Sequence, residues 1–337
     1  MLFNAVMLLV SLGLILLASY VFTNGIELLG SRLNLHQGAT GSILAAVGTA
    51  LPETIIPVIA ILVYHADPNS VQVGIGAIAG APFMLATLGF FVTGAAVLTY
   101  AALGKRKLTM QTDTRVIGRD LSFFLFLYGA AVLVTFAHDL VCFRPLKLLV
   151  ALTLLIAYIW YVRRTILADG EQHEDLEPLH LARLFRTGDH TPLILAQVAA
   201  ALALMVWGAD MFVRYVGSLS TAAGLSPLIL SMIITPIATE LPEKLNSVLW
   251  TGQRKDTMAL GNITGAMVFQ SSFPVVFGLL FTPWELHGAP LVSAAVALAG
   301  GGVLLAWIRW KRTMSPYVLL LGGPLYAVFV VYICLHK

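Results

Sequence analysis

The sequence predicts an all-α integral membrane protein in which ten transmembrane helices form two inverted five-helix repeats. This prediction rests on the composition, on ten long apolar segments and on a set of motifs that occurs twice. Of the 337 residues, 58% are hydrophobic and only 11% are charged, whereas soluble domains carry about 25% charged residues. The apolar residues form long blocks rather than the one-sided patterns of soluble helices and strands, so a bilayer explains them better than a globular core.

Ten apolar segments are long enough to cross a membrane, which takes about 20 mostly apolar residues. The first has no basic stretch before it and no small-residue cleavage site after it. We therefore expect it to remain as a helix rather than to be removed as a signal peptide. In order, the segments run approximately over residues 3–29, 39–64, 71–103, 121–137, 145–162, 192–215, 227–250, 258–281, 289–308 and 316–335.

The distribution of basic residues predicts the orientation in the membrane. All but four of the 20 Lys and Arg residues are assigned to the connections after odd-numbered segments, among them Lys244 after the seventh. By the positive-inside rule these connections are cytoplasmic and both termini are extracytoplasmic. We expect a multi-pass protein of the cell membrane that contacts lipid and inorganic cations and binds no nucleic acid. The four exceptions are Arg144, Lys147, Arg214 and Lys337.

Three motifs recur in the same order in the two halves of the chain. Each set occupies the first three segments of its half, so the repeating unit is five helices. Because five is odd, the second copy starts on the opposite side of the membrane, as in many secondary transporters. The paired motifs are GIE at 25–27 with GAD at 208–210, GTALPE at 48–53 with ATELPE at 238–243, and GAIAG at 76–80 with GNITG at 261–265.

The repeat divides the chain into residues 1–163 with helices one to five, a cytoplasmic linker at 164–191, and residues 192–337 with helices six to ten. The mixed charges of the linker are typical of a solvated segment rather than a domain. We expect Glu27 and Asp210 at helix ends near the membrane interface, outside the ion path.

Two glutamates, Glu53 and Glu243, lie well inside apolar segments at equivalent positions of the two repeats. An acidic residue at the centre of a membrane helix costs roughly 2.5–3.5 kcal/mol, so it needs a partner or a function. Their equivalence indicates that the two carboxylates share one partner.

A proline precedes each of these glutamates and removes one helical hydrogen-bond donor. Pro52 is expected to free the carbonyl of Gly48, and Pro242 that of Ala238. Bare carbonyls in a bilayer are costly unless they line a cavity or bind something. The same reasoning applies to Pro57 and Pro236, which are expected to free the carbonyls of Glu53 and Met232.

The groups near these glutamates are all hard oxygen ligands. Thr49 and Thr239 add hydroxyls, and Glu240 falls on nearly the same helix face as Glu243. Calcium takes six to eight oxygen ligands in flexible geometry, whereas softer metals favour cysteine or histidine. No cysteine or histidine lies at this depth in the sequence. The residues therefore predict a site for a transported hard cation and no resident cofactor.

These motifs resemble those of the cation/calcium exchanger superfamily, which includes the sodium/calcium exchangers. Its two repeats carry GTSLPE-like motifs followed one helix later by GNVxGSNxFN-like motifs. The resemblance covers both halves of the chain and is closest over residues 225–243, LSPLILSMIITPIATELPE. It implies that Glu53 and Glu243 are the central calcium ligands and that Thr49 and Thr239 contribute backbone or hydroxyl oxygens.

The chain departs from the family pattern at positions that the family uses partly for sodium. The serine after the threonine is replaced by Ala50 and Glu240. Glu240 is expected to act as a ligand or as a titratable group. Alanine stands at two further serine positions, Ala81 and Ala266, and the asparagine or aspartate positions hold Leu85 and Gln270. The predicted cation-binding set is therefore Glu53, Glu243, Thr49, Thr239, Glu240, Gln270, Gly48 and Ala238, with Glu53 and Glu243 as the metal ligands.

We expect a secondary active antiporter that exchanges calcium against sodium by alternating access. The resemblance implies that the first and sixth segments move against the second, third, seventh and eighth. A proton-coupled exchanger and a transport-inactive scaffold or sensor remain alternatives. A membrane enzyme is disfavoured because the chain has no HExxH or DDxxD motif and no Ser/His pairing at depth. The GAIAG and GNITG glycines could also serve close helix packing, and Asn262 is expected to hydrogen-bond between helices.

Overall fold

The computed structural model describes residues 1–32, 45–137, 143–168 and 177–336, and these ranges contain helices and no strand. The first half comprises α1 (Leu2–Arg32), α3 (Ala45–Val58), η2 (Ile59–Val63), α4 (Pro68–Met84), η3 (Leu85–Gly89), α5 (Phe90–Ala102), α6 (Thr114–Thr135) and α7 (Phe143–Ala168), where η2 and η3 are π-helical turns. The second half comprises α8 (His180–Phe185), α9 (Thr191–Ala223), α10 (Pro227–Thr239), α11 (Leu241–Gly252), α12 (Asp256–Gln270), α13 (Phe273–Phe281), α14 (Ala289–Lys311), α15 (Pro316–Leu319) and α16 (Gly322–Leu335).

Eight helical stretches in the described part of the chain are long and apolar enough to cross a membrane. The other two predicted segments are also helical, but neither forms one long helix. The second contributes the shorter apolar stretch Leu51–Val63. The seventh is divided between α10 and α11, so it does not form one continuous helix.

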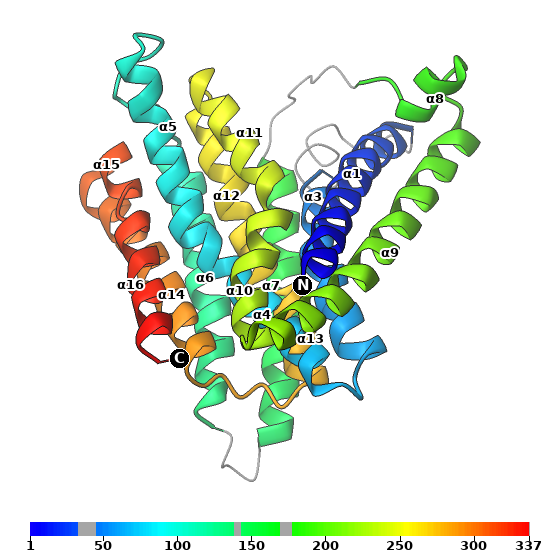
Figure 1. The fold of residues 1–337 in the computed structure, drawn as a ribbon. Coiled ribbons are helices and arrows are strands. Elements are labelled where there is room, and N and C mark those ends of the chain that lie inside the picture. The colour runs from blue at the N-terminus through cyan, green and yellow to red at the C-terminus, as the bar shows by residue number, and fades with distance from the viewer. Residues whose placement is uncertain (33–44, 138–142, 169–176, 337) are drawn as a thin grey trace.

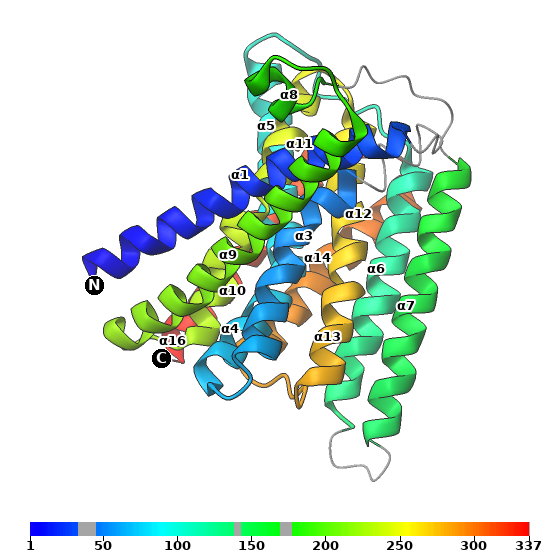
Figure 2. The same ribbon diagram turned by 90° about the vertical axis from the view of Figure 1, so that its right-hand side faces the viewer.

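The long helices α1 and α9 pack against each other along their length (Figure 2). The GIE and GAD motifs make this contact from both sides. A methyl group at Gly25 would lie 2.8 Å from Val198 of α9, and one at Gly208 would lie 2.9 Å from Ile15 of α1. Glycine at these two places therefore lets the helix axes approach closely. Each motif therefore lies against the helix that carries the other motif. Two equivalent motifs making equivalent contacts are what a structural repeat predicts.

The GAIAG motif lets α4 pack closely on α10 near the centre of the molecule (Figure 1). A methyl group at Gly76 would overlap the carbonyl of Leu228, and one at Gly80 would overlap the carbonyl of Met232. The equivalent glycines of GNITG have no such neighbour among the described residues. Nothing lies within 4 Å of a methyl group at Gly261, and the nearest atom at Gly265 is the Tyr161 hydroxyl at 3.7 Å. The packing explanation therefore holds for GAIAG and does not extend to Gly261.

A buried ion pair holds the connection between α5 and α6 on the first residue of α12. Arg106 is 6% exposed and Asp256 is 1% exposed. The guanidinium donates to both carboxylate oxygens at 2.7 and 2.9 Å, and also to the carbonyl of Thr251 at 2.7 Å. This connection is therefore fixed to the turn between α11 and α12.

Part of the predicted linker is packed rather than solvated. Leu179 and Ala182 are buried together with Ile194. The side chains of Asn24 and Gln197 hold the linker on α1 and α9, since they accept hydrogen bonds from the amides of its residues 180 and 181 at 3.1 and 2.9 Å. Burying apolar side chains of α8 against α1 and α9 accounts for this docking, which mixed charge alone does not reveal.

Candidate cation site

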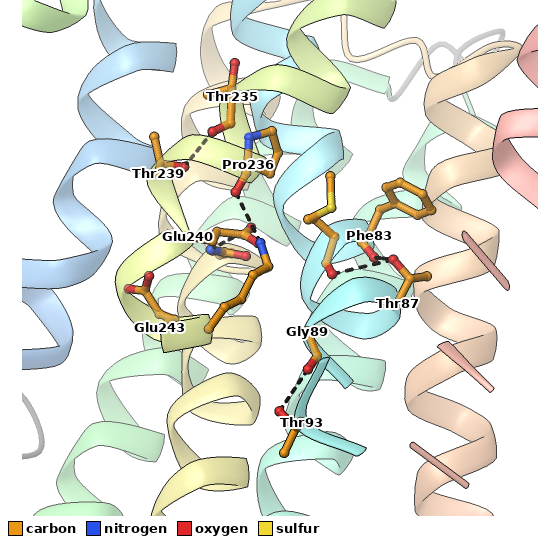
Figure 3. Close-up of polar contacts among 12 residues, drawn as sticks. Phe83, Thr87, Gly89, Thr93, Thr235, Pro236, Thr239, Glu240 and Glu243 are labelled. Carbon is orange, nitrogen blue, oxygen red and sulfur yellow. Dashed lines mark hydrogen bonds and ion pairs between the residues drawn. The ribbon is translucent and has the colours of Figure 1, made fainter. Parts of the chain in front are cut away.

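The helix that carries two of the predicted acidic residues is broken at Glu240. α10 ends at Thr239 and α11 begins at Leu241, while Glu240 has φ −91° and ψ 8° between them. Pro242 lies in the first turn of α11, where a missing N–H has no helical partner to lose. The sequence predicts one continuous segment over residues 227–250, and this is wrong in detail, because the helix stops at Thr239 and starts again at Leu241, next to the proline. Figure 3 shows Thr235, Thr239, Glu240 and Glu243 following one another through this break.

Helix α3 brings Glu53 to the same place. It packs against α10, α12 and α13, and the Glu53 carboxyl lies within electrostatic range of Glu243 and Glu240 and beside the side chain of Thr239. Glu53 is 3% exposed. Neither of its carboxylate oxygens has a hydrogen-bond partner among the described residues. A buried, unsatisfied carboxylate is costly, and the site contains one.

The three glutamates are almost completely shielded from solvent, with Glu240 0% and Glu243 2% exposed. Carboxylates so close together in a dry interior repel one another unless cations or protons neutralise them. Across the described side chains, no three His, Cys, Asp or Glu residues form a metal-binding group. Glu53 and Glu243 stay the predicted metal ligands, and Glu240 is paired with Lys244 inside the same cluster.

Glu240 forms an ion pair with Lys244, and this corrects our placement of the lysine. The Lys244 ammonium lies 2.9 Å from Glu240 Oε2 and its side chain is 11% exposed. It also donates to the carbonyl of Pro236 at 3.3 Å. The distribution of basic residues predicts a cytoplasmic connection for Lys244, but the residue lies on α11, one position after Glu243. A lysine that is mostly shielded from solvent normally needs a partner, and here a carboxylate one helical turn away supplies it.

Two other predicted residues lie in the cluster. Thr239 is 1% exposed, and its hydroxyl donates to the carbonyl of Thr235 at 3.0 Å. Gln270, at the end of α12, donates from Nε2 to Glu240 Oε1 at 3.4 Å, and its own Oε1 has no partner within the described chain. The structure thus brings Glu53, Glu243, Glu240, Thr239 and Gln270 together.

The remaining predicted ligands are Gly48, Thr49 and Ala238. Their backbone belongs to α3 and α10, but their side chains and contacts lie outside the described part of the structure. Their roles stay predictions.

One carbonyl that we expected to be freed by proline does not face the cluster. Pro236 removes the donor that Met232 would use, and the Met232 carbonyl instead lies against Gly80 of α4. This carbonyl serves packing.

The GNITG motif contributes polar contacts. As expected, Asn262 joins two helices, since its Nδ2 donates to the carbonyl of Glu243 at 3.0 Å. Thr264 donates to Asp120 at 2.9 Å, and Tyr161 donates to the same carboxylate at 3.1 Å. Asp120 is 1% exposed. We missed this buried acid because it lies one residue before the apolar run of the fourth segment.

Asp210 differs from its expected position at a helix end. It lies inside α9, where it accepts a hydrogen bond from the Tyr64 hydroxyl and pairs with Arg214 at 2.7 Å. Arg214 also donates to the Tyr64 oxygen at 2.6 Å. These three side chains join α9 to the end of η2, outside the glutamate cluster.

Comparison with known proteins places this arrangement in a family. The family model described as "Sodium/calcium exchanger protein" matches residues 3–167 and 193–335, and therefore most of the chain. The chain belongs to the sodium/calcium exchanger family. A curated relative, the inner membrane protein YrbG of Escherichia coli (strain K12), is 26% identical over 289 residues, covering 84% of this chain and 82% of YrbG. The putative antiporter CaxA of Alkalimonas amylolytica is 26% identical over 137 residues, covering 38% of this chain and 43% of CaxA.

Solved exchanger structures share the fold. The H+/Ca2+ exchanger CAX superposes with a TM-score of 0.69 at 16% identity, covering 98% of this chain and 82% of CAX. The sodium-calcium exchanger NCX_Mj superposes with a TM-score of 0.60 at 19% identity, covering 98% of both chains. At these identities the likeness concerns the fold alone. The chain is a multi-pass membrane protein, and the family to which it belongs is one of exchangers rather than enzymes.

Proposed function

We propose that this chain is a secondary active antiporter that exchanges calcium against sodium, with the calcium ion held between Glu53 and Glu243. One observation carries the proposal. Glu53 is buried, neither of its carboxylate oxygens has a hydrogen bond among the described residues, and it lies within electrostatic range of a second buried glutamate, Glu243, in the first turn of α11. Such a pair stabilises a divalent cation more than any neutral ligand can.

The chemistry of the neighbouring groups favours calcium. Thr239 and Gln270 add hydroxyl and amide oxygens, and no thiol or imidazole belongs to the described cluster. Oxygen-only ligand sets select calcium over softer transition metals. The relatives named H+/Ca2+ exchanger CAX and sodium-calcium exchanger NCX_Mj are consistent with this choice.

The proposed architecture is ten membrane helices in two inverted repeats, residues 1–163 and 192–337, joined by a cytoplasmic linker at 164–191. The two matched stretches of the family model begin and end close to these boundaries. The reciprocal contacts of Gly25 and Gly208 support an approximate two-fold relation between α1 and α9. We propose that both termini are extracytoplasmic, as the basic residues indicate.

Transport would proceed by movement of α1 and α9 against a core of α3, α4, α10, α11 and α12. The structure supports this division in one respect. α1 and α9 pair closely with each other, while Gly76 and Gly80 fix α4 to α10 inside the core. In such a cycle the cation site stays in the core and the α1–α9 pair changes the side from which it is reached.

Proton coupling is the second candidate, and Glu240 is the observation that favours it. This third buried carboxylate stands where the family has serine, while Ala81, Leu85 and Ala266 lack the polar groups used for sodium. A scaffold or sensor without transport would share these losses. It would not need to retain the buried Glu53 and Glu243 pair.

Flux measurements separate the three possibilities. Purified protein in lipid vesicles is loaded with sodium, with acid or with neither, and uptake of radioactive calcium is followed. Uptake driven by the outward sodium gradient supports the proposal, and uptake driven only by the proton gradient supports the second candidate. Folded protein that takes up no calcium under any gradient would favour the scaffold.

A further inference from the structure

Lys244 is a lysine inside the proposed ion site, and the sodium/calcium exchange chemistry does not account for it. Its ammonium contacts Glu240 Oε2 at 2.9 Å and the Pro236 carbonyl at 3.3 Å. The Glu240 side chain is 0% exposed and that of Lys244 is 11% exposed. Burying two charges has a large desolvation cost that their attraction often fails to recover. An ion pair placed here therefore calls for a functional explanation.

The oxygens around Lys244 are those that a small monovalent cation would use. One is a carboxylate oxygen. The other is a main-chain carbonyl at the last turn before the helix break, where ligand geometry is set by backbone and not by a flexible side chain. Hard cations favour carboxylate and carbonyl oxygens. The ammonium thus stands in a place with the chemistry of a sodium site, attached to the protein by its own side chain.

The pairing also divides the charge of the cluster. Glu240 has both oxygens engaged, Oε2 by Lys244 and Oε1 by Gln270 at 3.4 Å. One of the three carboxylates is thereby neutralised within the protein. The proposed function assigns the transported divalent ion to Glu53 and Glu243, whose two negative charges match that of the ion.

We propose that Lys244 is a built-in counter-cation that takes the place of one monovalent ion in the site, so that the exchanger binds fewer monovalent ions than its carboxylates alone would demand. This inference rests on the proposed exchange function and concerns the number of monovalent ions that the site binds. It also gives a reason for the joint presence of Glu240 and Lys244, since either residue alone would leave an unbalanced buried charge.

The test measures sodium binding without transport. Purified full-length protein in detergent at alkaline pH is melted over a range of sodium chloride concentrations, with choline chloride keeping the ionic strength constant. The variants are Lys244→Gln, the double variant Glu240→Gln with Lys244→Gln, and Lys107→Gln as a control at an exposed lysine.

Lys244→Gln leaves Glu240 without its cation, so sodium should bind there and stabilise the fold. Half-maximal stabilisation should occur at a sodium concentration at least about tenfold lower than in the wild type. The double variant and Lys107→Gln should respond as the wild type does. If Lys244→Gln responds to sodium as the wild type does, or if the double variant keeps the gain, the proposal is overturned.

Failure to fold is also informative. A double variant that folds when Lys244→Gln does not would support charge balance, because only the balance differs between them. If neither variant folds, Lys244 has a packing role and the proposal falls. Absence of calcium flux in the wild type would sink the exchange function while leaving the sodium result interpretable, so the two failures are distinguishable.

Discussion

Replacing Gly80 by alanine tests whether the GAIAG motif is a contact surface between α4 and α10. The added methyl group would overlap the Met232 carbonyl and lie 2.8 Å from the Met232 Cα and 2.9 Å from its carbonyl carbon. All of these atoms are backbone, so no rotamer change relieves the overlap. Overpacking costs typically about 1–3 kcal/mol, and a backbone clash belongs at the upper end. Alanine returns up to about 1 kcal/mol of helix propensity, which leaves a net loss of about 2 kcal/mol.

Gly261→Ala is the matched control, because nothing lies within 4 Å of its added methyl group. This variant should be stabilised by up to about 1 kcal/mol, so the two variants should differ by about 3 kcal/mol. Thermal unfolding followed by tryptophan fluorescence in detergent should separate their midpoints by on the order of 5–10 °C. Equal midpoints for the two variants would refute the proposed close contact between α4 and α10.

Three other perturbations have defined outcomes. Asp67 caps α4, and hydrogen bonds from the Ser70 hydroxyl and two backbone amides lower its pKa. Asp67→Ala should therefore cost about 1 kcal/mol near neutral pH. In the wild type this contribution should disappear as the pH falls below about 4. Chemical denaturation over a range of pH should therefore give the wild type and Asp67→Ala the same free energy of unfolding at low pH, and a difference that persists there would contradict the prediction. Tyr64→Phe removes the hydroxyl between Asp210 and Arg214 and should speed amide hydrogen exchange at the end of η2, whereas unchanged exchange would mean that this contact does not hold α9. Asp256→Ala leaves Arg106 as an unpaired buried charge and should lower the free energy of unfolding by about 3–5 kcal/mol. Replacing both residues by apolar ones should recover most of that loss in thermal unfolding, and a double variant as unstable as Asp256→Ala would contradict this explanation.

Eight of the ten transmembrane segments, and the burial of Glu53 and Glu243, could be predicted because a bilayer penalises polar groups so strongly. Glu53 and Glu243 stand out inside apolar runs, and the repeated Pro-Glu motif relates them to each other. The same penalty identified Asn262 as an interhelical donor. In each case a single polar residue within an apolar stretch was enough to predict a buried polar contact.

The features that were missed depend on which side chains meet in space. The positive-inside rule counts Lys244 together with Arg254 and Lys255 as a topology signal, and only the structure pairs it with Glu240. Asp120 was missed for a similar reason, since its partners Thr264 and Tyr161 come from distant helices. An i,i+4 spacing of Glu240 and Lys244 was a signal that could have been used.

The sequence also left open which glycine motif packs closely. GAIAG and GNITG have the same spacing of glycines, yet only GAIAG lies against a neighbouring backbone among the described residues. This asymmetry cannot be read from glycine spacing, because it depends on where the facing helix is broken or kinked. In α10, Pro236 leaves the Met232 carbonyl free to meet Gly80.

The most direct test of the shared carboxylate site is calcium uptake by Glu53→Gln and Glu243→Gln in vesicles. Glu285→Gln, at an exposed glutamate, serves as the control. Each site variant loses half of the paired negative charge while keeping its size, so uptake should fall at least about a hundredfold, the effect of losing roughly 2.7 kcal/mol of ion binding. The control should transport at the wild-type rate. Wild-type uptake by either folded site variant would contradict the claim that Glu53 and Glu243 together hold the transported ion.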